Sequence, residues 1–148
     1  MPGKSATLAN DWLKLIFNAT PIANIADNAS SSPLTVLYAS LHDGGLTNSL
    51  YLAGAQTAWE VSYTGYSRVA INRNSGAWTV TGNSVSPNSP IVFPTCTGSS
   101  DSAVALGIGT DSTGTGRLLW FGAILPFSLN IQVGYKIIMD TSTVITEV

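Results

Sequence analysis

The chain has 148 residues, of which 45% are hydrophobic and only 9% are charged, with a formal net charge of −2. Its few Lys and Arg residues are scattered and form no basic run, so we expect no nucleic-acid partner. The single cysteine, Cys96, excludes an intrachain disulfide. A weakly charged chain of this kind is typical of proteins that cover part of their surface with other subunits.

The length fits one compact domain. We expect an N-terminal helical segment (1–21), a connector (22–33) and a β domain (34–148). The N-terminus lacks the apolar stretch of a secretory signal. The longest apolar run, Leu118 to Phe127, contains Gly122 and Pro126 and is about half of the ~20 residues that a membrane helix requires, so we predict no membrane span.

The first predicted element is a short amphipathic helix, which Ser5 or Thr7 would cap and Pro21 would end. Its main apolar stripe consists of Leu8, Trp12, Leu15, Ile16 and Ala19. Leu13 and Phe17 lie off that stripe, so the helix carries more apolar surface than one contact covers. We predict that it packs both on its own sheet and on a neighbouring subunit.

From residue 34 onward, short apolar runs alternate with clusters of Gly, Pro, Asn and Ser, which predicts strands separated by turns. The predicted strands are Leu34–Leu41, Trp59–Tyr63, Ser67–Asn72, Ala77–Thr81, Ile91–Phe93, Ala103–Ile108, Leu118–Ile124, Leu129–Val133 and Tyr135–Met139. Their spacing favours an all-β fold, an antiparallel β-sandwich or jelly roll with one short N-terminal α-helix. The segment Leu118–Phe121 is apolar on both sides, which indicates a strand buried on both faces or a subunit contact.

Residues that carry catalysis or bind metals are scarce. The only histidine, His42, stands beside Asp43 at the end of a predicted strand, in no catalytic signature, and we interpret it as a strand-end residue entering a turn. Cys96 is interpreted as a buried small apolar group. One His and one Cys cannot build a zinc tetrahedron, although an ion bound by Asp101 and Asp111 stays open. We predict no enzyme, no cofactor and no metal site.

Two further interpretations concern sugars. No pair stands out among the carboxylates that a glycoside hydrolase would need, which are Asp27, Asp43, Glu60, Asp101, Asp111 and Asp140. Tryptophan faces are able to stack on sugars, but each of the four lies in an alternating or apolar segment and is interpreted as a core residue. These tryptophans are Trp12, Trp59, Trp78 and Trp120.

The order of several short motifs resembles the short tailed-phage virion proteins commonly labelled phage tail fibre protein, of the head decoration or fibre type. The motifs are Asp11-Trp12-Leu13, Leu37 to His42, Glu60-Val61, Gly65-Tyr66-Ser67-Arg68-Val69-Ala70, Trp78, Ile91-Val92-Phe93-Pro94, Leu106-Gly107-Ile108, Gly116 to Ala123, and a terminal strand pair around Gly134. The similarity covers nearly the whole chain. The chain departs from the family in a shorter loop at His42–Gly45 and a longer stretch at Gly98–Ser102.

The resemblance implies a virion component that is made in the cytoplasm of the bacterial host. We expect a capsid decoration or cement protein, a homotrimer that contacts the major capsid protein or other virion proteins. The alternative is a tail fibre or tail-tip module that binds a host glycan through loops such as Tyr63-Thr64-Gly65-Tyr66.

Two predictions about contacts follow from the virion context. The predicted subunit interface comprises Trp12, Leu13, Phe17, Trp120 and Phe121. Glu60 and Arg68 are expected to pair across neighbouring strands near the Gly65-Tyr66 turn, and an exposed pair of this kind contributes about 0 to 1 kcal/mol.

Overall fold

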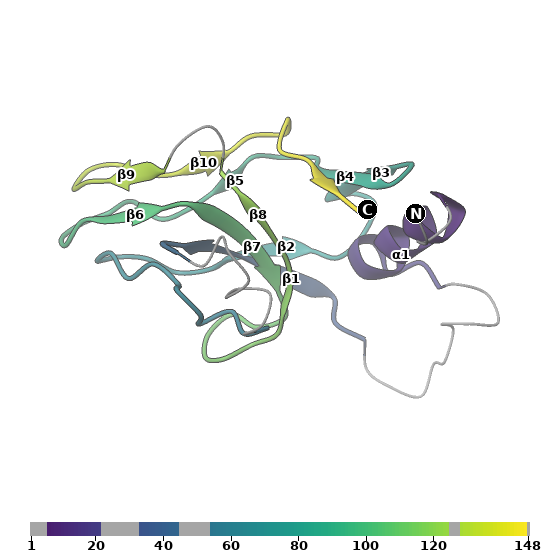
Figure 1. Cartoon of the computed structure of the whole chain (residues 1–148), viewed down its shortest axis with the longest axis horizontal. Helices are drawn as coiled ribbons and strands as arrows, with labels where there is room; N and C mark the ends of the chain where they lie inside the picture. The colour runs from purple at the N-terminus through teal and green to yellow at the C-terminus, as the bar shows by residue number, and fades with distance from the viewer. Residues whose placement is uncertain (1–5, 22–32, 45–53, 125–127, 148) are drawn as a thin grey trace. The chain divides into compact units, whose positions relative to one another are not determined.

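A computed structural model describes residues 6–21, 33–44, 54–124 and 128–147 (Figure 1). Within these ranges the chain forms one α-helix and eleven short strands arranged in four sheets. The prediction of an all-β fold with one N-terminal helix is confirmed. No helix in the described ranges combines the length and the apolar character needed to cross a bilayer.

The described chain divides into two compact units. Unit 1 comprises residues 1–36, 72–90 and 139–148, and unit 2 comprises residues 37–71 and 91–138. Each unit combines segments that are distant in the sequence. The single-domain prediction concerns how the chain folds, and it stays a prediction.

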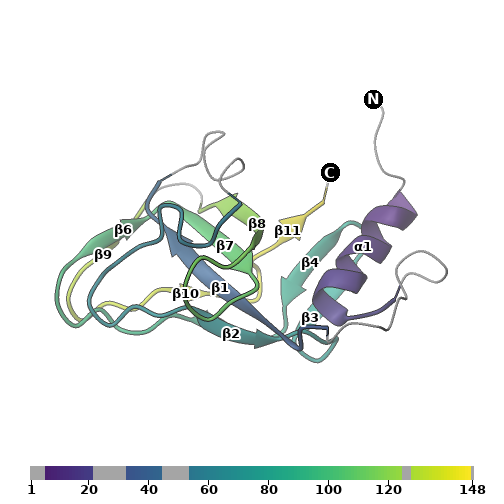
Figure 2. The same cartoon turned by 90° about the horizontal axis from the view of Figure 1, so that it is seen from below.

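Unit 1 is built from the helix and a three-stranded sheet. Helix α1 (Ala6–Asn18) lies beside β3 (Trp78–Thr81) and β4 (Ser84–Pro87), and β11 (Ile145–Thr146) pairs with β4 in the order β11-β4-β3 (Figure 2). Both pairings are antiparallel. Phe17 meets the ring of Trp78 edge-on at a centroid distance of 4.7 Å.

The predicted helix is confirmed, but its buried stripe was predicted wrongly. Ala9, Leu13 and Phe17, spaced at i, i+4 and i+8, are buried, while Trp12 is 42% exposed. The ring contact of Phe17 with buried Trp78 orients this stripe toward the sheet. The helix carries two apolar stripes, and sequence alone did not show which one faces β3.

The C-terminal end of α1 is closed by an arginine from another segment. Ala19 adopts a left-handed backbone conformation (φ 53°), as residues just beyond helix ends often do. The guanidinium of Arg73 donates hydrogen bonds to the carbonyl oxygens of Leu15 and Ile16, and at 2.9 Å to that of Leu34. A cation thus satisfies carbonyl groups that the helix itself leaves unpaired.

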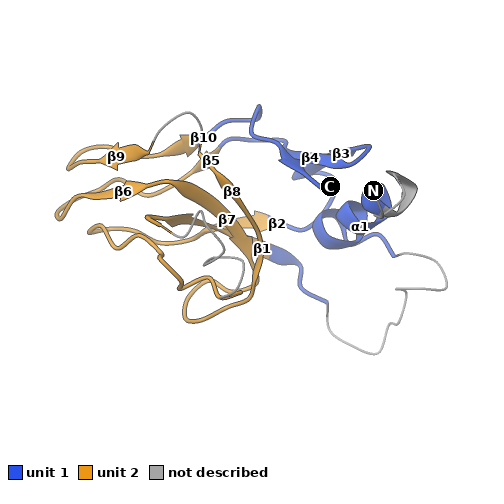
Figure 3. Ribbon diagram, viewed as in Figure 1, with its two compact units in different colours: residues 1–36, 72–90, 139–148 blue, residues 37–71, 91–138 orange. Residues whose placement is uncertain are grey.

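Unit 2 contains a four-stranded sheet in the order β2-β1-β7-β8, coloured with the rest of the unit in Figure 3. Its strands are β1 (Val36–His42), β2 (Val69–Asn72), β7 (Ala105–Gly109) and β8 (Leu118–Ala123), and β7 runs antiparallel to both β1 and β8. The remaining strands form two two-stranded sheets. One pairs β5 (Ile91–Val92) with β10 (Ile138–Met139), and the other pairs β6 (Asp101–Ala103) with β9 (Leu129–Ile131).

The two faces of β1 differ in chemistry. Leu37, Ala39 and Leu41 are buried on one face, where neighbouring β7 contributes Leu106 and Ile108. Residues at alternate positions point to the opposite face. The opposite face of β1 carries Tyr38, Ser40 and His42. This face holds the buried polar side chains that are described in the next subsection.

Several strand predictions need correction, and the predicted strand Ala103–Ile108 covers parts of two strands, β6 and β7, which belong to different sheets. Trp59–Tyr63 forms no strand and makes only an isolated bridge between Glu60 and His42, because the positive φ of Trp59 (50°) interrupts the extended backbone. The short, serine-containing β4 and the two-residue β11 were not predicted. Strand β8 lies at a sheet edge with Leu118–Phe121 half-buried, so burial on both faces was wrong.

Candidate functional site

The described residues include three fully buried polar side chains, and all of them lie on the polar face of β1. Ser40 and His42 come from β1 itself, and Gln56 comes from the loop that precedes β2; each is 0% exposed. Burial of polar groups is costly unless they are hydrogen-bonded. These three side chains, together with Glu60, Tyr66 and Arg68 described below, are called the polar cluster.

Strand β7 makes room for the cluster with glycines. Gly107 lies opposite Ser40 in the register, and Gly109 follows two residues later on the same face. A Cβ on Gly107 would lie 2.5 Å from His42 Nε2, and one on Gly109 would lie 2.1 Å from Gln56 Cδ. The Gly-Ile-Gly pattern inside a strand thus reflects the close approach of polar side chains.

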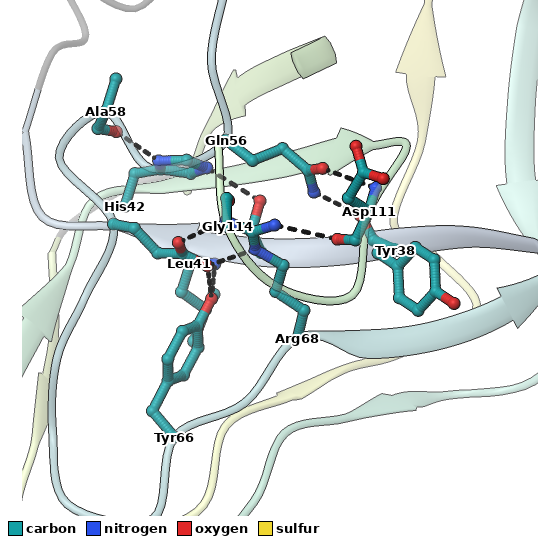
Figure 4. Close-up of polar contacts among 11 residues, drawn as sticks. Tyr38, Leu41, His42, Gln56, Ala58, Tyr66, Arg68, Asp111 and Gly114 are labelled. Atoms are coloured by element: carbon teal, nitrogen blue, oxygen red, sulfur yellow. Dashed lines mark hydrogen bonds and ion pairs between the residues drawn. The ribbon is translucent and has the colours of Figure 1, made fainter. Parts of the chain in front are cut away.

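His42 links β1 to the loop at residues 54–60. Its Nδ1 lies 2.8 Å from the carbonyl oxygen of Ala58 (Figure 4). Since a carbonyl only accepts, Nδ1 carries the proton, and Nε2 then accepts a hydrogen bond from the Ser40 hydroxyl at 2.9 Å. Burial lowers the pKa of His42, against smaller opposing effects of the Ala58 hydrogen bond and the Glu60 charge. The neutral imidazole, with its proton on Nδ1, is the form that matches both hydrogen bonds.

The Ser40–His42 hydrogen bond has the length found in nucleophile and base pairs. Both side chains are nevertheless 0% exposed on a central strand, so the hydroxyl does not reach the surface. The pair acts as a structural connection. The interpretation of His42 as a strand-end residue is confirmed, because β1 ends there.

Arg68 and Glu60 form a bidentate ion pair in the polar cluster. Nε and Nη2 of Arg68 donate to Oε1 and Oε2 of Glu60, both at 2.7 Å. The predicted pairing is confirmed, but the prediction that it is exposed was wrong, since the Arg68 and Glu60 side chains are only 3% and 15% exposed. The hydrogen bonds with Glu60 raise the pKa of Arg68.

The same guanidinium also binds the loop between β7 and β8. Nη1 of Arg68 donates to the carbonyl oxygen of Asp111 at 2.9 Å, and Nη2 donates to that of Gly114 at 2.8 Å (Figure 4). One side chain therefore joins the Glu60 loop to the tip of another loop. Charge-assisted, bidentate geometry of this kind gives arginine its specificity as a connector.

Tyr66 extends the network to the backbone of β1. Its hydroxyl donates to Oε1 of Glu60 at 2.8 Å and accepts from the backbone N–H of Leu41 at 3.1 Å. Burial is the largest cause that raises the pKa of Tyr66, so the hydroxyl remains protonated as a donor. Its ring meets that of Tyr63 edge-on at 5.3 Å.

Gln56 bridges β1 and the β7–β8 loop. Its Oε1 accepts from the backbone N–H of Asp111 at 2.9 Å, while its Nε2 points to the carbonyl oxygen of Tyr38 at 3.4 Å. Its own backbone N–H donates to the carbonyl oxygen of Thr115 at 2.9 Å. Sequence reasoning missed Gln56 and Ser40. The strand glycines Gly107 and Gly109 were the available signal.

The tryptophans divide into buried and exposed ones. Trp78 is 1% exposed, as predicted for a core residue, and Trp120 is only half-buried on the edge strand β8. Trp12 and Trp59 are 42% and 48% exposed, so the core interpretation was wrong for those two. Trp59 belongs to the loop that His42 and Arg68 hold. Of the loop aromatics predicted to face a host, Tyr63 is 2% exposed, with its hydroxyl donating to the carbonyl oxygen of Pro94, and Tyr66 is half-buried.

The five residues of the predicted subunit interface occupy different environments. Trp12 is exposed, Leu13 and Phe17 are fully buried inside unit 1, and Trp120 and Phe121 are half-buried on β8. Leu13 and Phe17 lie one turn apart on the same side of α1, whereas Trp120 and Phe121 are consecutive on β8, opposite Ile108 and Gly107, and point to opposite faces of the sheet. Whether any of the five contacts a partner chain stays a prediction.

The remaining candidates have structural roles. Cys96 is 1% exposed, as predicted. Asp101 accepts hydrogen bonds from the backbone N–H groups of Ser62 and Ser102. Hydrogen bonds from Ser142 lower the pKa of Asp140. In the part of the chain that the structure describes, no three side chains of the His, Cys, Asp or Glu type gather to hold a metal. Asp27 lies outside that part.

These features define a class of protein: a small β protein whose polar cluster fixes loops and exposes an aromatic side chain. The chain belongs to the family described as podophage GP4 fiber I protein gp80, whose match covers residues 3–146. It is thus a phage structural protein of the fibre type and a virion component. Membership of this family indicates a structural role. A comparison with curated proteins gave no match.

Proposed function

We propose that the protein is a non-enzymatic part of a tail fibre and that it binds the surface of the host bacterium. The carrying observation is the family match, which covers residues 3–146 and describes a podophage fibre protein. Of the two functions considered from sequence, this match favours the fibre module over the capsid decoration. Synthesis in the host cytoplasm and assembly with copies of itself, as a homotrimer, belong to the same proposal.

The polar cluster supports a recognition role. Binding residues are often carried on loops that a rigid scaffold positions. Here Arg68 connects the Glu60 loop to the β7–β8 loop, and His42 fixes the carbonyl of Ala58. Loops fixed in this way lose less conformational entropy on binding than loops that must first become ordered.

Two measurements on intact particles and cells test the proposal. Gold-labelled antibodies against the chain should mark tail fibres in electron micrographs of the phage. The purified, fluorescently labelled protein should bind host cells and compete with phage adsorption, while a non-host strain serves as the control. Label on the head together with an absence of cell binding would refute the fibre function and support decoration.

Assembly is tested separately. Light scattering after size-exclusion chromatography should give three times the monomer mass if the purified protein is a homotrimer. A monomer at high concentration would contradict the self-association part of the proposal and leave host binding open to the cell assay.

A further inference from the structure

One exposed aromatic residue of unit 2 has an uncommon backbone conformation. Trp59 is 48% exposed and has φ 50°. Among the described non-glycine residues only Ala19 shares a positive φ, and Ala19 stands at a helix end. For a bulky side chain such a conformation is an outlier, and outliers of this type persist where the surroundings impose them.

The surroundings of Trp59 impose the conformation from both sides. On the N-terminal side, the carbonyl of Ala58 accepts the hydrogen bond from His42. The carbonyl of Trp59 itself accepts from the backbone N–H of Asp43 at 2.8 Å. On the C-terminal side, Glu60 is held by Arg68. The buried polar cluster therefore fixes the direction in which the indole leaves the backbone.

The indole also has a support. A Cβ on Gly44 would lie 2.8 Å from Cδ1 of Trp59, 3.3 Å from Cγ and 3.4 Å from Nε1. The five-membered ring thus lies close against the backbone of Gly44, where a larger residue would displace it. Nearly half of the residue remains exposed, so the indole packs on Gly44 and still presents surface to the solvent.

We infer that Trp59 is a stacking platform for a pyranose ring of a surface polysaccharide. This inference rests on the proposed host-binding function and names its contact point. The C–H groups of a pyranose form an apolar face that fits a flat aromatic ring, while its hydroxyls require polar surroundings.

The polar neighbourhood of Trp59 favours a sugar over a protein partner. Protein hot spots lie within rings of further contacts that exclude water. Among the described residues of unit 2, the other exposed large apolar side chains lie in other segments: Val92, Val133, Tyr135 and Ile138. Asp43 and Thr57, which flank Trp59 in its own loops, are exposed and polar. An exposed aromatic ring beside exposed polar side chains matches the amphipathic surface of a sugar.

The test uses variants that separate binding from folding. Trp59→Gly removes the indole and places the residue that best tolerates positive φ, and Trp59→Asn does the same with a second tolerant residue. Trp59→Phe retains a flat ring. Tyr135→Ala is the matched control, because Tyr135 is an aromatic of the same unit with 56% exposure.

Binding is measured to host cells by flow cytometry and, by calorimetry, to polysaccharide extracted from the host, with capsular and lipopolysaccharide fractions as separate arms. We expect Trp59→Gly and Trp59→Asn to keep the melting temperature of the unchanged protein or exceed it, and to bind about tenfold more weakly. Trp59→Phe and Tyr135→Ala should bind nearly as tightly as the unchanged protein.

The outcomes separate the role of Trp59 from the proposed host binding. If the unchanged protein binds host cells and the Gly and Asn variants bind equally well, Trp59 is not the platform and the host-binding function still stands. If both variants unfold, Trp59 is a structural residue, which also overturns the inference. If the unchanged protein binds neither cells nor either polysaccharide fraction, the proposed host binding itself is wrong.

Discussion

Removal of the Arg68 guanidinium should destabilise the protein far more than an exposed ion pair would. Arg68→Met keeps most of the aliphatic stem but removes the donors to Glu60, Asp111 and Gly114. Breaking a buried ion pair costs about 3–5 kcal/mol. Glu60 retains 15% exposure and regains some hydration in the variant, so we expect the lower end, about 3 kcal/mol.

This loss is measurable by thermal and chemical unfolding. For a chain of this length, each kcal/mol shifts the melting temperature by about 3 °C, so Arg68→Met should melt about 9 °C lower. Glu60→Gln should cost about 2 kcal/mol, since the amide still accepts one hydrogen bond. The double variant should lose at least about 1 kcal/mol less than the sum of the two single variants.

Arg117→Met provides the control, because Arg117 is exposed in the β7–β8 connection. It should change stability by no more than about 0.5 kcal/mol. If Arg68→Met costs less than about 1 kcal/mol, or if the cycle shows additive effects, the ion pair behaves as an exposed one. Burial would then not strengthen the pair.

Three further variants address the other parts of the fold. Burial lowers the pKa of His42, so the unchanged protein loses stability as the pH falls below the ordinary pKa of 6.5. His42→Gln should therefore flatten the dependence of the melting temperature on pH. An equal slope in the variant would contradict this. Gly109→Ala should cost about 1–3 kcal/mol of stability, because the added Cβ meets Gln56. Gly122→Ala should be nearly neutral, because nothing lies within 4 Å of its added Cβ. Equal losses of the two variants in chemical denaturation would show that close packing around Gly109 does not matter. Arg73→Lys should speed amide hydrogen exchange in the last turn of α1, since an ammonium cannot reproduce the forked hydrogen bonds, and unchanged exchange would argue against this cap.

Sequence periodicity predicted the elements with strong local patterns. Alternation identified β2 and β3, and the helical spacing followed by Pro21 identified α1. It could not choose between two apolar stripes of one helix, because that choice depends on the long-range contact of Phe17 with Trp78. Two-residue β11 carries too little pattern to be recognised before its partner β4 is known.

The candidate site was predictable only in part. The Glu60–Arg68 pair was predicted from the family resemblance, but its burial depends on Asp111 and Gly114, which lie more than 40 residues further along the chain. Likewise, the exposure of Trp59 follows from a positive φ that distant hydrogen bonds impose. Local sequence carries no signal for such conformations. Glycines inside β7 were the one local sign of the polar cluster.

The attachment of the β7–β8 loop at Asp111 and Gly114 has a practical consequence for engineering. Both anchoring carbonyls flank an exposed tip, Ser112-Thr113, so a foreign peptide inserted between these two residues would leave the guanidinium and its acceptors in place. Loop tips of this kind tolerate insertions because few contacts are lost. The tip is therefore a suitable point for displaying epitopes or altered targeting peptides on the phage particle.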